Sequence, residues 1–182
     1  MSRTSLLSTL PRLVALAGLL AVAGCDSGGS DRPFDVDDYT GTYNGTVLTV
    51  FSNGTSNTET SATAVVTIVK GTGNTVTVTI DAGAPETGGD DPAPVVFPGT
   101  YDDSGARFVV ATGTNSFAIT VDGDGEIDGG GSARLFDLGL DLDPEGEITS
   151  DRFLLTVNVE VTDGNDDVPT GSEGRFSVSA FR

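Results

Sequence analysis

Residues 62–80 read ATAVVTIVKGTGNTVTVTI, and this stretch decides the fold class. Apolar residues occupy every second position in its two halves: Ala62, Ala64, Val66 and Ile68, then Val76, Val78 and Ile80. This period of two is the pattern of a strand with one buried face and one exposed face. Residues 70–74 lie between the halves and carry two glycines, which is typical of a hairpin connection. The stretch therefore predicts two antiparallel strands joined by a short turn.

The same alternation recurs along the rest of the chain. Further strands are expected near residues 47–51, 95–97, 108–110, 117–121, 136–142, 153–161 and 176–180. No segment shows the 3.6-residue period of an amphipathic helix, and turn residues separate most of the runs. The sequence predicts one all-β domain over residues 39–182, built as an antiparallel meander of eight or nine strands.

The exposed faces of these strands are acidic, so their apolar faces need cover. In the run 136–142, for example, Leu138 and Leu140 alternate with Asp137 and Asp141. A closed barrel provides that cover and leaves no edge strand, so we favour it over a two-sheet β-sandwich, which remains the alternative. A membrane-spanning barrel is not expected, because the chain has no Trp and only three Tyr for aromatic girdles.

The first 24 residues form an export signal, with Arg3 and Arg12, no acidic residue, and an apolar run over 13–23. That run is too short for a permanent membrane helix, which takes about 20 apolar residues. It ends in Val22-Ala-Gly-Cys25, which resembles the lipobox of bacterial lipoproteins. The resemblance implies that Cys25 receives a diacylglycerol and becomes the mature N-terminus. It also implies a membrane-anchored protein of the cell envelope, on its periplasmic or cell-surface face. The alternative is an ordinary secretory signal.

Residues 25–38 then link the lipid to the domain. The segment is small, polar and acidic, which is the composition of a flexible tether. Cys25 is the only cysteine of the chain, so a disulfide and a cysteine metal site are both excluded.

The chain is strongly acidic, with 9 basic and 27 acidic residues and a net charge of −18. Removal of the signal takes away two arginines and no acid, so the mature chain is more acidic still. Nucleic-acid binding needs clustered Lys and Arg, and Lys70 is the only lysine, so no nucleic-acid partner is expected. Attraction to anionic lipid is excluded for the same reason. We favour adaptation to a salty, halophilic habitat over a calcium-rich surface, because the acids are spread over most loops.

The predicted domain begins with Tyr39-Thr-Gly41-Thr-Tyr43-Asn-Gly45. This motif resembles the opening strand of lipocalin-like domains, in which a glycine, one residue and an aromatic follow each other. The resemblance implies that Tyr43 stands where classical lipocalins carry tryptophan and packs across the base of the barrel. The family's basic partner of that aromatic is not assigned to a residue by the sequence. A glycine-rich strand start in a β-sandwich would give the same motif.

The sequence offers little support for a catalytic function. The chain has no histidine, and Cys25 is used by the lipid, which excludes Ser-His-Asp triads, Cys-His pairs and ordinary zinc sites. A glycosidase would need two carboxylates about 5 to 10 Å apart in a cleft, and no pair stands out. We therefore expect no enzyme and no cofactor.

Calcium is the one metal for which the sequence offers ligands. Asp122, Asp124, Glu126 and Asp128 follow each other at two-residue spacing and resemble the first half of a calcium loop. Ile127 stands where such a loop has glycine, and the residues 141–148 depart from the pattern in other ways. We prefer the interpretation that both segments are acidic turns, because Asp-Gly pairs suit tight hairpins.

These observations lead to two expectations of function. The first is a non-enzymatic, lipid-anchored β-barrel that binds a small apolar ligand or an envelope protein. It requires a cavity of at least about 300 Å³ for the ligand. The second is a structural or adhesive β-sandwich at the cell surface, stiffened by calcium.

Overall fold

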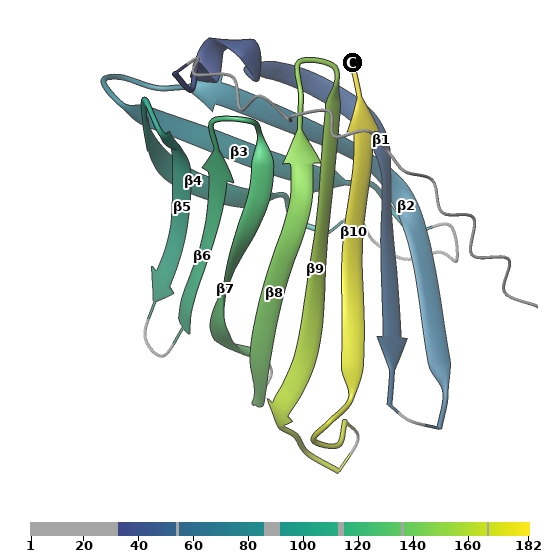
Figure 1. Cartoon of the computed structure of the whole chain (residues 1–182). Helices are drawn as coiled ribbons and strands as arrows, with labels where there is room; N and C mark the ends of the chain where they lie inside the picture. Colours follow the sequence, from purple (N-terminus) through teal and green to yellow (C-terminus); the bar gives the residue numbers. More distant parts are fainter. Residues whose placement is uncertain (1–32, 54, 86–91, 113–114, 136, 167) are drawn as a thin grey trace, which may run out of the picture.

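The computed structural model of the chain describes residues 33–53, 55–85, 92–112, 115–135, 137–166 and 168–182. In this part, ten antiparallel strands follow each other around a closed barrel, in which the last strand pairs with the first (Figure 1). Their bounds are β1 Gly41–Ser52, β2 Asn57–Lys70, β3 Thr75–Ala82, β4 Val95–Asp102, β5 Gly105–Thr112, β6 Asn115–Asp122, β7 Glu126–Leu135, β8 Leu138–Ile148, β9 Arg152–Asp163 and β10 Glu173–Phe181. The predicted all-β meander and closed barrel are confirmed, and the two-sheet sandwich is not the fold.

The strands of the quoted stretch 62–80 pair as the alternation predicts. In β2 and β3, Val66 lies opposite Ile80 and Ile68 opposite Val78, and all four side chains are buried. Their neighbours of opposite parity, such as Val65 and Val69, are exposed. The same alternation places the core inside the barrel, because every strand turns one side toward the lumen.

The structure has ten strands where we expected eight or nine, and the strand that the prediction lacked is β7. This strand contains Gly129, Gly130 and Gly131, and glycine is unfavourable in strands. The structure shows why two of them are tolerated there. A Cβ atom on Gly129 would lie 2.2 Å from the Ala118 carbonyl oxygen, and one on Gly131 would lie 2.0 Å from that of Ser116. The backbone of β6 thus approaches β7 so closely at these two positions that only glycine fits there.

The segment 141–148 is also a strand rather than the acidic turn that we preferred. It forms most of β8, and its acids alternate with inward-facing residues. Pro144 is buried inside the barrel beside Gly129, and the pairing of β7 with β8 is interrupted between Ile127 and Gly131. Proline cannot donate a backbone hydrogen bond. Pro144 therefore lies at a position where β8 does not pair with β7.

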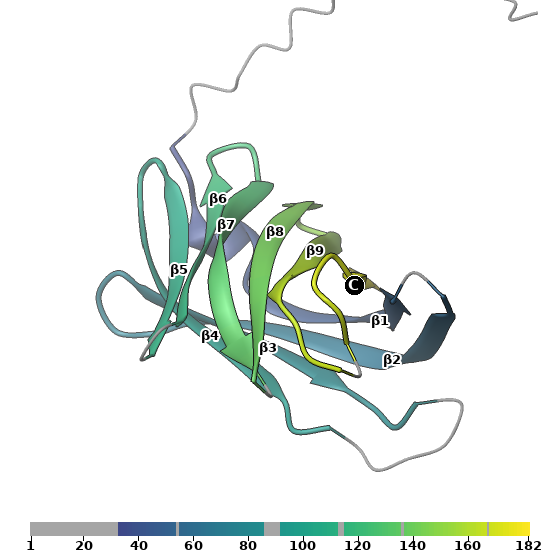
Figure 2. The same ribbon diagram turned by 90° about the horizontal axis from the view of Figure 1, so that it is seen from below.

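The barrel has two unlike ends. At one end, the upper one in Figure 1, the short helix η1, Val36–Asp38, lies against the strands. Figure 2 looks from the other end, with η1 behind the strands. We call these the closed end and the open end. No helix of the described ranges is long and apolar enough to cross a membrane. The signal 1–24, Cys25 and the first part of the tether lie outside the described residues.

Candidate functional site

The closed end is plugged by the residues that precede β1. Phe34 and Val36 are buried against the core, and the ring of Phe34 stacks on that of Tyr39 with centroids 5.2 Å apart. The Phe34 N–H donates to the Asp103 carbonyl in the turn between β4 and β5. Packing therefore begins within the segment 25–38, whose last five residues belong to the folded body.

Tyr43 is the central side chain of this end and is 0% exposed. Its hydroxyl lies 2.8 Å from the Tyr39 carbonyl and 3.2 Å from the Thr149 carbonyl, to which it donates. The guanidinium of Arg182 lies over its ring, with Cζ 4.7 Å from the centroid, and donates to the Thr40 carbonyl. Burial raises the pKa of Tyr43 above its ordinary value, while Arg182 opposes that rise. The side chain thus links η1, β1, the β8–β9 turn and the residue after β10.

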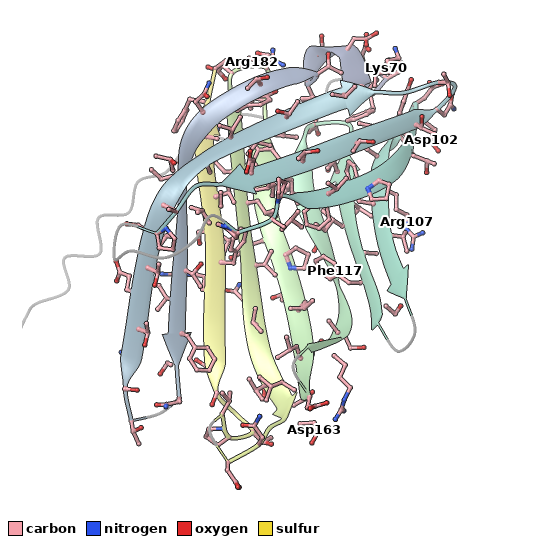
Figure 3. The ribbon with its side chains drawn as sticks, turned by 180° about the vertical axis from the view of Figure 1, so that it is seen from behind. Lys70, Asp102, Arg107, Phe117, Asp163 and Arg182 are labelled. Carbon is pink, nitrogen blue, oxygen red and sulfur yellow. The ribbon has the colours of Figure 1, made fainter. Side chains whose placement is uncertain are left out.

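This arrangement is compatible with a lipocalin-like fold. The resemblance implied that Tyr43 packs across the barrel base, and the side chain lies there, tilted against Phe153 at 6.3 Å between centroids. The sequence could not assign its basic partner, which is Arg182. Figure 3 shows Arg182 and Lys70 at this end of the molecule and Asp163 at the opposite end.

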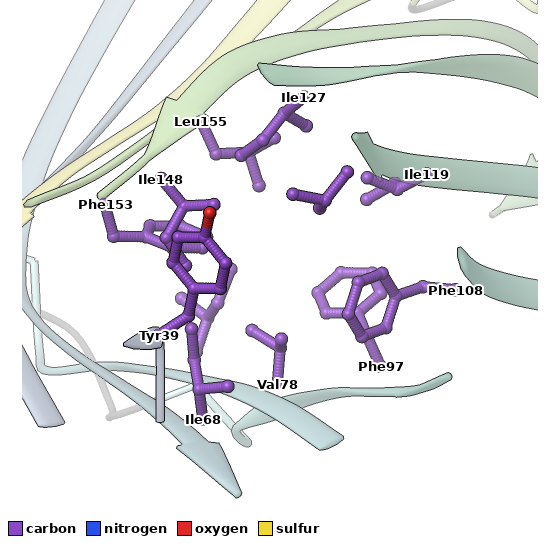
Figure 4. A pocket seen from close by; sticks show the side chains of 12 residues that line it. Tyr39, Ile68, Val78, Phe97, Phe108, Ile119, Ile127, Ile148, Phe153 and Leu155 are labelled. Carbon is purple, nitrogen blue, oxygen red and sulfur yellow. The ribbon is translucent and has the colours of Figure 1, made fainter. Parts of the chain in front are cut away.

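The interior next to the closed end is packed. Figure 4 shows the apolar side chains that surround its remaining space, among them Tyr39, Phe97, Phe108 and Phe153. The cavity that they leave measures about 40 Å³. Ligand pockets span about 300–1,000 Å³. A ligand enclosed in the centre of the barrel is therefore not supported.

A larger apolar pocket of about 250 Å³ lies toward the open end, and we call it the mouth pocket. It is lined by residues of β1 to β4, of the described part of the β3–β4 connection and of β10: Val47, Thr49, Thr60, Ser61, Ala62, Ile80, Ala82, Gly83, Pro85, Pro92, Ala93, Val95 and Phe176. Thr49 shares the inward parity of Tyr43 and Val47, yet it is exposed. The lumen is therefore open to solvent at this level. Its volume falls below the roughly 300 Å³ that we required for a ligand cavity, so the pocket holds only a ligand smaller than that limit or one that is partly enclosed.

The sequence predicted only part of this lining. The inward residues of β1, β2 and β3 follow from the alternation, as does Phe176 of β10. Pro85, Pro92 and Ala93 come from the connection between β3 and β4, which has no periodic pattern. Their apolar character in a link between strands is the one signal that could have pointed to them.

The predicted calcium residues do not converge in the structure. Asp122 ends β6, and its Oδ1 accepts the backbone N–H of Asp124 at 3.0 Å and that of Glu126 at 2.9 Å, which closes the β6–β7 hairpin. Asp128 lies further along β7, where its Oδ1 accepts the Gly129 N–H. Among the described residues, no three His, Cys, Asp or Glu side chains gather so that they could hold a metal ion. Calcium binding stays a prediction, and the geometry supports the acidic-turn interpretation for Asp122.

Acidic side chains instead form a row on the outer face of the barrel. Asp141, Glu160 and Glu173 lie directly opposite one another on β8, β9 and β10. They border a polar hollow of about 620 Å³, together with Asp143 and Asn158. Like charges in directly opposed positions are destabilising at low salt. The row therefore concentrates charge repulsion on one face.

No residue pattern of the described part forms a recognisable catalytic arrangement, and Cys25 lies outside it. Of the ion pairs in the described part, Lys70 with Asp37 at 2.7 Å and Arg152 with Glu147 at 2.6 Å belong to the closed end, and Arg134 with Asp163 at 2.9 Å lies at the open end (Figure 3). Comparison with known proteins adds no assignment, because no family model, no curated protein and no solved structure matches the chain significantly.

Proposed function

We propose that the chain is a lipid-anchored protein of the bacterial cell envelope that binds a small apolar ligand in its mouth pocket and has no catalytic activity. The observation that carries the binding proposal is the mouth pocket itself, an apolar space of about 250 Å³ at the open end of the barrel. Sites of small ligands are concave and mostly apolar, with few polar groups. The anchor rests on the lipobox that ends at Cys25.

The position of the mouth pocket suits an anchored protein. Cys25 precedes Pro33 by eight residues, which span at most about 29 Å when extended. Pro33 leads into η1 at the closed end, so a lipid on Cys25 would hold that end toward the membrane. Strands of 12 or 14 residues, as in β1 and β2, separate the two ends. The mouth pocket would then face away from the lipid and remain open to ligands in the aqueous phase.

Non-catalytic binding agrees with the side chains at hand. None of the described residues that line the mouth pocket is ionisable, and general acid–base catalysis needs such a group within hydrogen-bond reach of the substrate. The other expectation, an adhesive β-sandwich stiffened by calcium, loses its fold, because the strands close into a barrel.

The binding proposal is tested with N-phenyl-1-naphthylamine, an uncharged apolar probe that fluoresces on leaving water. The protein is residues 26–182, which contain the whole described fold and avoid the detergent that a lipidated chain requires. We expect saturable binding that Thr49→Phe abolishes, because the new ring fills the open lumen at an exposed position. Thr46→Phe is the matched control, since Thr46 is exposed and has the outward parity on the same strand.

Equal binding by wild type and Thr49→Phe would contradict the mouth pocket as the ligand site. The anchor is tested separately in cells. Mass spectrometry of the mature N-terminus should show a lipid on Cys25, and Cys25→Ser should release the protein from the membrane fraction. Retention of Cys25→Ser in that fraction would contradict the lipid anchor.

A further inference from the structure

The ring of Phe34 occupies an apolar position at the closed end of the barrel. It is 8% exposed and stacks on the ring of Tyr39, with centroids 5.2 Å apart and an interplanar angle of 24°. Tyr39 also lines the apolar cavity of about 40 Å³ in the packed interior, as Figure 4 shows. The Phe34 ring is thus one side chain away from that cavity.

Phe34 is attached to the barrel differently from the aromatic residues of the strands. Phe117 of β6, which is also 8% exposed, lies between Val110 of β5 and Gly131 of β7 in two ladders. Phe34 precedes η1, and its backbone joins the barrel through its N–H, which donates to the Asp103 carbonyl at 2.9 Å. Release of Phe34 therefore breaks no strand pairing, whereas release of Phe117 would open two ladders.

The hydrogen bonds of η1 do not involve Phe34. The cap residue Asp35 accepts the Asp37 N–H at its Oδ1 and the Asp38 N–H at its carbonyl, at 3.0 and 3.1 Å. The Tyr39 N–H donates within the same turn. The chain can therefore turn between Phe34 and Asp35, so that the ring leaves its position while η1 stays on the barrel.

The closed position of Phe34 is held by a small free-energy difference. Burial of its ring stabilises that position, but fixing the backbone and side chain of one residue costs conformational entropy that offsets much of the gain. Segments with few backbone hydrogen bonds to the rest of a protein open locally, at a free energy far below that of global unfolding. Phe34 meets this condition, and the strands do not.

We infer that Phe34 is an intramolecular occupant of a ligand site, and that an uncharged apolar ring of about the size of benzene takes its place against Tyr39. Phe34 belongs to the buried apolar cluster, in which a charged ligand would lose its hydration without a partner. The site is distinct from the mouth pocket, whose lining contains neither Phe34 nor Tyr39. The inference therefore goes beyond the proposed function and does not depend on it.

A tryptophan at position 34 tests the displacement directly. The chain has no Trp, so Phe34→Trp introduces a fluorophore that reports on this position alone. Toluene added to residues 26–182 should shift its emission to the red in a saturable way, because the indole moves from the apolar site into water. Phe117→Trp is the matched control and should show no red shift, since its strand is paired on both sides. No shift in Phe34→Trp, or the same shift in both variants, would overturn the inference.

Hydrogen exchange tests the same step without a changed side chain. The Phe34 N–H loses its acceptor when the residue leaves the site, so toluene should speed its exchange with water at least about tenfold in NMR spectra of the wild type. The N–H groups of Asp38 and Tyr39 are the internal control, because η1 keeps their hydrogen bonds. Unchanged exchange at Phe34 would show that the ring is not displaced, and faster exchange at all three would show that η1 melts. Either result would overturn the inference.

Removal of the occupant should strengthen binding. We expect Phe34→Ala to bind toluene at least about tenfold more tightly than a chain with Phe34, because a site that is filled most of the time has a reduced apparent affinity. Both chains carry Thr49→Phe, which fills the mouth pocket, and calorimetry measures the two affinities. Equal affinities would contradict competition by Phe34. Thr49→Phe should also leave the red shift of Phe34→Trp unchanged. Loss of that shift would place toluene in the mouth pocket, so that the inference falls while the proposed function stands.

Discussion

The guanidinium of Arg182 lies over the ring of Tyr43, 4.7 Å from its centroid, so the residue that follows β10 contacts the middle of the closed end. The same guanidinium donates to the Thr40 carbonyl just before β1. β1 and β10 pair along nine residues, from Asn44 with Phe181 to Ser52 with Glu173. Arg182 thus adds contacts between the two ends of the barrel's strand order, β1 and β10, beyond the last residue pair of their ladder.

Loss of this contact should weaken the barrel measurably. Arg182→Ala removes a cation–π contact worth about 0.5–2 kcal/mol, together with the hydrogen bond to Thr40. We expect the free energy of unfolding, measured in urea, to fall by about 1–2 kcal/mol. Arg182→Lys should recover only part of it, because an ammonium lacks the planar face that stacks on the ring. Full recovery by lysine would show that charge alone is responsible.

Tyr43 should give the barrel a pH dependence in the alkaline range. Burial raises its pKa, so the folded state favours the protonated phenol more strongly than the unfolded chain does. The resulting stability is fully present below the ordinary tyrosine pKa of 10.0 and is lost as the pH rises through the folded value. Urea unfolding at pH 8 to 11.5 should show a steeper loss in wild type than in Tyr43→Phe. Parallel curves would contradict this role, since the other groups titrate alike in both proteins.

Gly45 should tolerate no side chain, because it lies where β1 and β10 meet. A Cβ atom there would be 1.9 Å from the Ser179 carbonyl oxygen and 2.6 Å from the Ala180 Cα, both backbone atoms that cannot turn aside. Gly45→Ala should cost about 1–3 kcal/mol or more in the free energy of unfolding. Gly123→Ala is the matched control with an expected change within about 0.5 kcal/mol, because nothing lies within 4 Å of its added Cβ. An unchanged Gly45→Ala would mean that the seam can open locally.

The sequence predicted the fold well because the alternation is a local property. Val66, Ile68, Val78 and Ile80 needed only their spacing to be placed inside. β7 was missed because it contains glycines, which sequence patterns count against a strand. These glycines are needed because carbonyl oxygens of β6 lie close to them. A close approach between the backbones of paired strands leaves no periodic signal in the sequence.

The candidate site was predictable to a smaller extent for the same reason. Tyr43 was recognised by its motif, whereas Arg182 is 139 positions away and becomes its partner only when the barrel closes. The mouth pocket depends on how much of the lumen the inward side chains of all strands fill at each level. This is a property of the whole barrel. The spacing suggested a shared metal site for Asp122 and Asp128. In the hairpin, the two carboxylates instead accept hydrogen bonds from different backbone N–H groups, those of Asp124 and Gly129.

Calcium should add nothing specific to the stability of the barrel. The Oδ1 of Asp122 is already engaged by two backbone N–H groups, and no three acids gather in the described part. Thermal unfolding of residues 26–182 should therefore show the same midpoint with calcium and with chelator at matched ionic strength. Sodium chloride should raise the midpoint in both cases, because it screens the acidic surface. A rise that calcium alone produces, and that Asp128→Asn removes, would establish the site and revive the calcium-stabilised module.

The acidic row should be the place where one reversed charge stabilises the protein most. Glu160 lies directly opposite Asp141 on one side and Glu173 on the other, so Glu160→Lys replaces two repulsions by two attractions. Each such pair is worth about 0.2–1 kcal/mol, and we expect a rise in the free energy of unfolding of that order in low salt. At 1 M salt the Debye length is about 3 Å, and most of the gain should disappear. Asp81→Lys is the control, because it changes the net charge equally but lies opposite Val65. An equal gain from both variants would assign the effect to the net charge of the chain rather than to the row.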